Sequence, residues 1–138
     1  MKALTRNALI AMSVLLGASS AVYSQNYPTK PIRMIVPATP GGAADTLSRT
    51  VAQKLSEAWG FPVVVENRGG AAGIIGAEAA ARSPNDGYTL MMGSAGGITI
   101  HPSLYPKLPY DPVKDFTPVV MVANSPLILV VHPRRESR

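Results

Sequence analysis

The chain has 138 residues, a length typical of a single domain. Its 13 Lys and Arg outnumber 8 Asp and Glu, and it contains no cysteine, which excludes disulfides and thiol chemistry. The basic side chains are scattered and are not interleaved with aromatic ones. A nucleic-acid-binding protein is therefore not expected, despite a pI of about 9.8.

The N-terminus has the pattern of a secretory signal peptide. Two basic residues precede an apolar run over residues 8–18, and small residues stand where a signal peptidase cleaves. The run is shorter than the roughly 20 residues of a membrane-spanning helix. We therefore expect residues 1–24 to be a signal peptide, cleaved after Ser24 or after Ala21, and residues 25–138 to be the exported chain.

Short apolar runs alternate with helical patterns between residues 32 and 92. The predicted elements are, in chain order, a strand over 32–36, a helix over 45–59, a strand over 61–66, a helix over 74–82, a turn at 83–87 and a strand over 88–92. This alternation predicts βαβ units, that is, an α/β fold with a parallel sheet and right-handed crossovers.

The longer predicted helix has an apolar stripe. Leu47, Val51 and Leu55 recur at helical spacing and mark the expected core face, whereas Ser48 belongs to the polar side. Gly60 stands where a left-handed C-terminal cap residue is common. The single tryptophan and four methionines also fall in predicted elements and are expected in the core: Trp59, Met34, Met91, Met92 and Met121.

A glycine-rich loop follows each of the three strands, at residues 37–45, 67–73 and 93–97. Backbone N–H groups and the dipole at a helix start attract anions, and glycine lets a ligand approach the backbone closely. Ligands of open α/β sheets bind outside the carboxyl ends of the strands. The three loops should therefore rim one edge of the sheet and form a pocket for a small anion such as a carboxylate. The simpler alternative for any one loop is a plain connection between strand and helix.

The pattern changes after residue 100. Five prolines between residues 101 and 118 exclude a long regular element and predict an ordered, irregular surface segment. Residues 119–123 and 127–131 predict two further short strands around a turn. An apolar strand without a neighbour would be an aggregation risk.

Five sequence phrases together are similar to the beginning of a known family. They are PIRMIVP (31–37), PGGAAD (40–45), VVENR (64–68), PNDGYTL (84–90) and LYPKLPYDPVKDF (104–116). In this order they resemble the Bug family, the periplasmic solute-binding receptors of tripartite tricarboxylate transporters. The resemblance runs from about Tyr27 to Pro133.

The resemblance implies a periplasmic binding protein-like α/β fold of Venus-flytrap type, with residues 25–138 forming part of the first domain and the second domain missing. It also implies a monomeric periplasmic receptor, not an enzyme, that needs no cofactor or metal and delivers its ligand to membrane permease subunits. That ligand would be a di- or tricarboxylate, an amino acid or an aromatic acid, held largely by backbone amides. The ligand-binding residues carried over by motif are Thr39, Gly41, Gly42, Ala43 and Asp45 in the first loop, and Ser94, Ala95 and Gly96 in the third.

The chain departs from the family pattern in two ways. The family's second loop usually reads Asn-Arg-Pro-Gly-Ala-Gly-Gly, so Gly69 replaces a proline and Ala72 a glycine, which predicts a looser entry and leaves this loop's role open. Family receptors are also considerably longer, and residues 134–138 do not resemble the usual continuation. The chain is therefore interpreted as a truncated or frame-shifted receptor. The alternative is a fragment that binds no ligand, because a flytrap closes on its ligand with two domains.

An enzyme is the rival class, and the motifs disfavour it. Residues 93–96 are similar to a nucleophile elbow, but Met92 stands where that pattern needs glycine. Neither a dinucleotide fingerprint nor a phosphate-binding loop is present. His101 and His132 have no partner at metal-ligand spacing, so a metal site is not expected.

Two charged loop residues have structural alternatives to ligand binding. Asp45 is either an N-terminal cap of the long helix or a ligand contact. Arg68 could clamp a carboxylate, but pairing with Glu66 is the expected role of this side chain.

Overall fold

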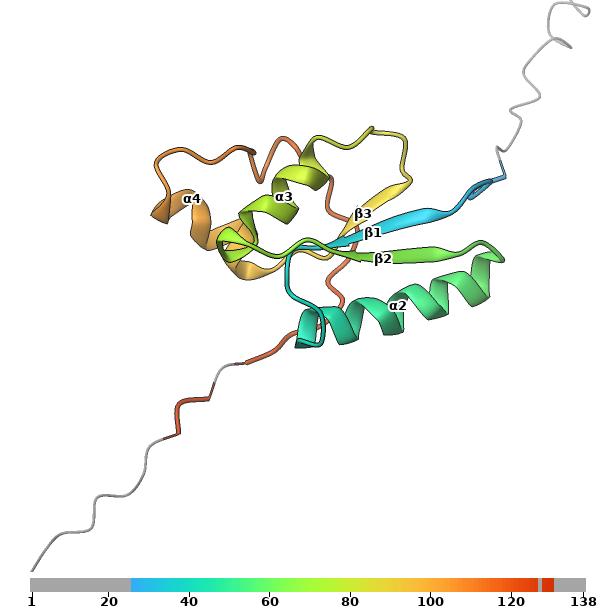
Figure 1. The fold of residues 1–138 in the computed structure, drawn as a ribbon, viewed down its shortest axis with the longest axis horizontal. Coiled ribbons are helices and arrows are strands. Elements are labelled where there is room, and N and C mark those ends of the chain that lie inside the picture. Colours follow the sequence, from blue (N-terminus) through green and yellow to red (C-terminus); the bar gives the residue numbers. More distant parts are fainter. Residues whose placement is uncertain (1–25, 127, 131–138) are drawn as a thin grey trace, which may run out of the picture.

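The computed structural model describes residues 26–126 and 128–130 (Figure 1). Its elements are β1 (Ile32–Val36), α2 (Ala43–Trp59), β2 (Val63–Asn67), the 3₁₀ turn η1 (Ala71–Gly73), α3 (Ile74–Ala81), β3 (Thr89–Met91), the π-helical turn η2 (Gly96–Ile100) and α4 (His101–Leu104). The first three predicted strands and both predicted helices are confirmed, with ends shifted by at most two residues. The predicted signal peptide over residues 1–24 lies outside the described residues.

The three strands form one parallel sheet in the order β2–β1–β3. Ile32 of β1 pairs with Val63 of β2, and Met34 of β1 pairs with Leu90 of β3 on the other side. Helix α2 packs on β1 and β2, whereas α3 packs on β1 and β3, so the two helices cover opposite faces of the sheet (Figure 1). This is the α/β arrangement that the alternation of elements predicts.

The central strand is buried on both faces, as expected of a parallel strand between two helix layers. Every residue of β1 except Arg33 is buried. Met34, as predicted, lies in the hydrophobic core, together with Ala52 of α2 and Val63 of β2. The sheet thus gives the loops at its edge a rigid base.

Helix α2 begins two residues earlier than predicted and ends where predicted. Gly42 is its N-cap, with extended backbone dihedrals of φ −81° and ψ 174°. Gly60 follows the last helical residue with φ +71°, and its N–H donates to the carbonyl of Ser56 at 3.0 Å. Glycine adopts this left-handed conformation without the steric penalty of other residues, so the predicted C-terminal cap is confirmed.

The face that α2 turns toward the sheet agrees with the prediction only in part: Val51 and Leu55 pack against the core, as expected. The buried residues of this helix are small or polar: Asp45, Ser48 and Ala52. Ser48, expected on the polar side, is 0% exposed, and its hydroxyl donates to the carbonyl of Ala44 at 2.6 Å. Leu47 and Trp59, expected in the core, are 38% and 36% exposed. Small side chains let the helix approach the strands closely, and the backbone carbonyl one turn earlier satisfies the serine hydroxyl.

The predicted strand over residues 119–123 is wrong. Residues 117–126 and 128–130 have no regular structure. Of the second predicted strand, over 127–131, residues 127 and 131 lie outside the described residues. Met121 is 80% exposed and is therefore not a core residue. A strand requires a neighbour for its ladder of hydrogen bonds, and no described strand pairs with this segment.

The proline-rich segment is irregular from residue 105 to 118, as predicted. Before it, η2 and α4 form one continuous helical stretch, for which the sequence carries no clear helical pattern. Pro102 lies in the first turn of α4, a position that tolerates the missing N–H of proline.

Candidate functional site

The loops after β1 and β3 leave neighbouring strands at the same edge of the sheet (Figure 1). Strand β2 lies on one side of β1, and β3 lies on the other side of β1. The chain therefore passes from β1 to β2 and then back across β1 to β3. The strand order therefore reverses between β1 and β3, and open α/β sheets bind their ligands at such switch points. The predicted residues of the first and third loops flank this point, whereas the second loop lies beside it.

The first loop turns the chain from β1 into the start of α2. Gly41 has a left-handed backbone with φ +86°, and its N–H donates to the Asp45 carboxylate at 2.8 Å. Thr39, Gly42 and Ala43 are exposed, and no side chain caps the helix start. Because the first N–H groups of a helix have no acceptor within it, Ala43 offers a free donor at this edge. The N–H of Gly41 is already used within the loop.

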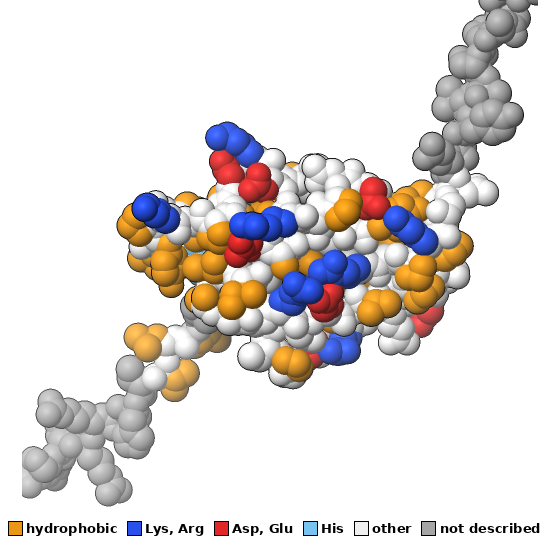
Figure 2. Space-filling view, turned by 45° about the horizontal axis from the view of Figure 1, so that its top comes forward, with side chains coloured by type: hydrophobic (Ala, Val, Ile, Leu, Met, Phe, Trp, Pro, Cys, Tyr) orange, Lys and Arg blue, Asp and Glu red, His pale blue; other side chains and the backbone are white. Residues whose placement is uncertain are grey.

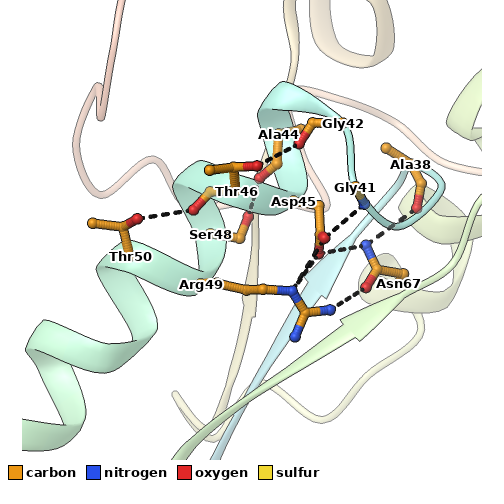
Figure 3. A network of polar contacts seen from close by, with 10 residues as sticks. All are labelled: Ala38, Gly41, Gly42, Ala44, Asp45, Thr46, Ser48, Arg49, Thr50 and Asn67. Carbon is orange, nitrogen blue, oxygen red and sulfur yellow. Dashed lines mark hydrogen bonds and ion pairs between the residues drawn. The ribbon is translucent and has the colours of Figure 1, made fainter.

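Asp45 lies in the first turn of α2, and its carboxylate is turned inward (Figure 3). Besides the Gly41 N–H, it accepts hydrogen bonds from Arg49 Nε at 3.0 Å and from Asn67 Nδ2 at 2.9 Å. The residue is 4% exposed. The bonds from Arg49, Gly41 and Asn67, in that order, lower the pKa of Asp45 to about 2. Asp45 thus organises the loop and helix start, and a contact between Asp45 and a ligand stays a prediction.

Two side chains that belong to no predicted site motif join the first loop to the second. Arg49 donates from Nη2 to Asn67 Oδ1 at 3.0 Å (Figure 3). Asn67, the last residue of β2, also donates to the carbonyl of Ala38 at 3.4 Å. The i, i+4 spacing of Asp45 and Arg49 on a helix could have indicated the ion pair. The hydrogen bonds of Asn67 to the first loop and α2 have no such local signal, because Asn67 comes from a strand distant in the sequence.

Ser94 of the third loop caps the helical stretch formed by η2 and α4. Its Oγ accepts the Gly97 N–H at 3.3 Å, and its carbonyl accepts the Ile98 N–H at 3.0 Å. This is the geometry of a serine N-cap. Ala95 and Gly96 are then the first two residues of the stretch, and their N–H groups have no acceptor within it. The hydroxyl of Ser94 is therefore used to cap the helix. The backbone N–H groups of Ala95 and Gly96 can donate to water or to a ligand.

The second loop and the start of α3 pack closely against the first loop. A Cβ atom added at Gly73 would lie 2.8 Å from the carbonyl oxygen of Pro37, and one at Gly76 would lie 2.7 Å from Pro37 Cα. A Cβ at Gly69 would lie 3.2 Å from the backbone nitrogen of Thr39. The expectation of a looser entry at Gly69 is therefore wrong. The second loop supports the first from behind the switch point.

The second loop also carries two alanines with left-handed backbones. Ala71 and Ala72 have φ values of +46° and +56°, a region that costs an L residue about 1–2 kcal/mol. We expect Ala72→Gly to raise the free energy of unfolding by about 0.5 kcal/mol, because relief of strain exceeds the added entropy of the unfolded chain. Urea unfolding of the full chain measures the change. The matched variant Ala79→Gly, inside α3, should lower stability by about 1 kcal/mol. A destabilised Ala72→Gly protein would contradict the strain argument.

Arg68 pairs with Glu66, as predicted. The Nε atoms of Arg68 and Arg33 each lie 2.5 Å from one oxygen of the Glu66 carboxylate. These contacts, that of Arg68 first, lower the pKa of Glu66. Because Arg68 is engaged within its own strand and loop, nothing directs its guanidinium toward the switch point.

The described surface carries charges of both signs side by side (Figure 2). Apolar side chains gather in the same view at the end of the molecule that carries α4. A shallow depression of about 860 Å³ lies there, lined by η2, α4 and the proline-rich segment, and none of the predicted site residues lines it. Within residues 26–126 and 128–130, no cluster of three or more His, Asp or Glu side chains could hold a metal ion.

Comparison with known proteins gives consistent matches. Residues 47–137 match the family described as tripartite tricarboxylate transporter family receptor, TctC. The protein BugT of Bordetella pertussis is 44% identical over 119 residues, which cover 86% of this chain and 36% of BugT. MatC from Rhodopseudomonas palustris with bound malate superposes with a TM-score of 0.64 at 38% identity, over 67% of this chain and 32% of MatC. An R. palustris protein with adipate gives 0.62 at 42% identity, over 68% of this chain and 31% of that protein.

The parallel sheet is matched by solved periplasmic binding proteins such as BugD, at 39% identity and a TM-score of 0.59, so the fold is an α/β fold of that class. The chain belongs to the TctC family of tripartite tricarboxylate transporter receptors, which includes the Bug proteins. It spans about a third of the length of BugT and of MatC. In the part of the chain that the structure describes, no helix is long and apolar enough to cross a membrane.

Proposed function

We propose that this chain is part of a periplasmic receptor. The receptor binds a small carboxylate and presents it to the permease subunits of a tripartite transporter. The carboxylate is held at the switch point between β1 and β3. The observation that carries this proposal is the pair of helix starts flanking that point, one at Ala43 and one at Ala95, whose first backbone N–H groups have no acceptor within their helices.

The electrostatics of the first loop favour an anion. Asp45 would by itself repel a carboxylate, but it is buried and accepts hydrogen bonds from Arg49, Asn67 and Gly41. Its charge is therefore compensated within the protein. The dipole of α2, a helix of 17 residues, remains directed at the switch point.

The ligands named for two similar proteins support a dicarboxylate. One solved structure holds malate and the other adipate, and both align with this chain at 38% identity or more. Both molecules carry two carboxylates. A ligand with an anionic group at each end matches a site with donors on two loops that follow adjacent strands, so we propose a dicarboxylate for this chain.

The affinity of this chain should be weak. Thr39, Gly42, Ser94 and Ala95 are exposed, so a ligand resting on them would stay hydrated on its other side. The same exposure could also prevent the chain from binding any ligand, which is the alternative to weak binding. Titration of the full chain with malate and adipate, followed by the amide NMR signals of Ala43, Ala95 and Gly96, separates the two. Adipamide, the neutral diamide of adipate, is the control ligand.

Shifts at those three amides with the dicarboxylates, and none with adipamide, are the expected result. Absence of any shift would favour the fragment that binds nothing. Shifts confined to the depression beside α4 would refute the switch-point site. A sub-micromolar Kd would contradict the expected weakness.

Gly42→Val should abolish dicarboxylate binding and leave the fold intact. A valine fits the extended backbone of residue 42, and the nearest atom to its Cβ, the carbonyl oxygen of Thr39, is 3.9 Å away. Its methyl groups would cover the first N–H groups of α2. The same titration gives the affinity, and circular dichroism gives the thermal midpoint. Gln53→Val, an exposed change on the same helix, is the control, and unchanged binding in Gly42→Val would remove the first loop from the site.

A further inference from the structure

The helical turn that follows the third loop contains a carbonyl group that its own helix cannot satisfy. In η2 the hydrogen bonds span five residues, so the His101 N–H donates to the Gly96 carbonyl. The next carbonyl, that of Gly97, would take its hydrogen bond from residue 102 in the same register. Residue 102 is proline and has no N–H.

A side chain from the proline-rich segment replaces the missing donor. The hydroxyl of Tyr110 donates to the Gly97 carbonyl at 2.7 Å. Tyr110 is 6% exposed, and its ring packs edge-on against Phe116 with 5.9 Å between the ring centres. Burial raises the pKa of Tyr110, so the hydroxyl retains its proton at neutral pH.

The histidine beside it has one compatible tautomer. His101 is 5% exposed, and its Nδ1 lies 3.3 Å from the Tyr110 oxygen. The single hydroxyl proton of Tyr110 is directed at Gly97, so this oxygen can only accept from His101. His101 must therefore carry a proton on Nδ1.

We propose that Tyr110 is a positioning residue for the third loop: with His101, it completes the turn that Pro102 interrupts, and so fixes the backbone donors of Ala95 and Gly96 at the switch point. This inference rests on the proposed function for its ligand, but not for the geometry it describes. The proline-rich segment thereby stabilises the conformation of the third loop, which forms one side of the proposed binding site.

The test compares two tyrosines in the full chain. Tyr110→Phe removes the bonded hydroxyl and keeps the ring on Phe116. Tyr105→Phe is the matched control, because the Tyr105 ring packs edge-on against His101 at 5.3 Å while its hydroxyl makes no hydrogen bond within the described residues. Amide hydrogen exchange at Gly97 and Ile98 reports the turn, and the nitrogen NMR shifts of the His101 ring report its tautomer.

Tyr110→Phe should accelerate exchange at Gly97 and Ile98 roughly fivefold or more, as the loss of a neutral hydrogen bond implies, with exchange in β1 unchanged. The His101 ring should move from the Nδ1–H toward the Nε2–H form. Tyr105→Phe should change neither. Equal exchange in both variants, or an Nε2–H tautomer in the unmodified protein, would overturn the proposal.

Dicarboxylate titration of the same variants separates this inference from the proposed function. Weaker binding in Tyr110→Phe, with Tyr105→Phe unaffected, is expected where the unmodified chain binds. If the unmodified chain binds neither malate nor adipate, the proposed function fails for this chain, whereas the exchange and tautomer results still decide the role of Tyr110.

Discussion

Gly76→Val should be strongly destabilising. A Cβ at this position would lie 2.5 Å from the carbonyl oxygen of Arg68 and 2.7 Å from Pro37 Cα. Both atoms belong to the backbone of loops that the sheet edge holds, so neither can move away as a flexible side chain would. Helix α3 would have to separate from the first loop. We expect a loss of about 3 kcal/mol or more, a large part of the stability of a small domain.

Urea unfolding followed by circular dichroism measures this loss. Ile75→Val, the neighbouring residue in α3, introduces the same side chain at a position that is 52% exposed. Its effect should stay within about 0.5 kcal/mol. Equal stabilities for the two variants would show that α3 can shift away from Pro37 at little cost.

Asp45→Asn should make the protein less stable at neutral pH and less sensitive to acid. The carboxylate accepts hydrogen bonds at both oxygens, and an asparagine amide would place an NH₂ group against one of those donors. Its pKa of about 2 lies below the value of about 3.9 in an unfolded chain. The ionised group therefore stabilises the fold above about pH 4, and this contribution disappears as the pH falls toward 2.

Unfolding by urea between pH 2 and pH 7 tests this prediction. The difference in stability between the unmodified chain and Asp45→Asn should be largest near pH 7 and should shrink through the window from about 4 to 2. Glu57→Gln is the control, since Glu57 pairs with Lys54 on the exposed side of α2 and such pairs contribute little. A constant difference across the range would mean that Asp45 stays protonated or unpaired in the folded protein.

The sequence predicts the local elements well, because their signals are local. The β-strand runs, the helical spacing and the cap at Gly60 each depend on residues within one or two turns of one another. The strand expected over residues 119–123 shows the limit of this reasoning, because a strand needs a partner and apolar alternation cannot say where that partner is. The same holds for Ser48, whose burial depends on how closely α2 approaches the sheet.

The arrangement of the loops at one edge of the sheet was predictable, but their internal hydrogen bonding was not. Glycine-rich loops after parallel strands indicate one edge of a sheet, and the order β2–β1–β3 places the first and third loops at the switch point. The sequence alone does not reveal that the Gly41 N–H donates to Asp45 or that the Tyr110 hydroxyl donates to the Gly97 carbonyl. Asn67 and Gly76 act across distances in the chain that no motif spans. Such long-range contacts decide which backbone donors remain for a ligand.

The small side chains on α2 influence the dimensions of the proposed binding site without lining it. A helix behaves as a stiff rod, so the thickness of the layer at Ser48 and Ala52 sets the height of the whole helix above β1 and β2. That height in turn fixes where the first N–H of α2 stands relative to the carboxyl end of β1. Two chains with identical glycine loops would therefore hold the start of α2 at different heights above the sheet if one carried a bulkier residue at position 52. If the proposed site binds a carboxylate, part of its selectivity would accordingly depend on core residues that do not contact the ligand.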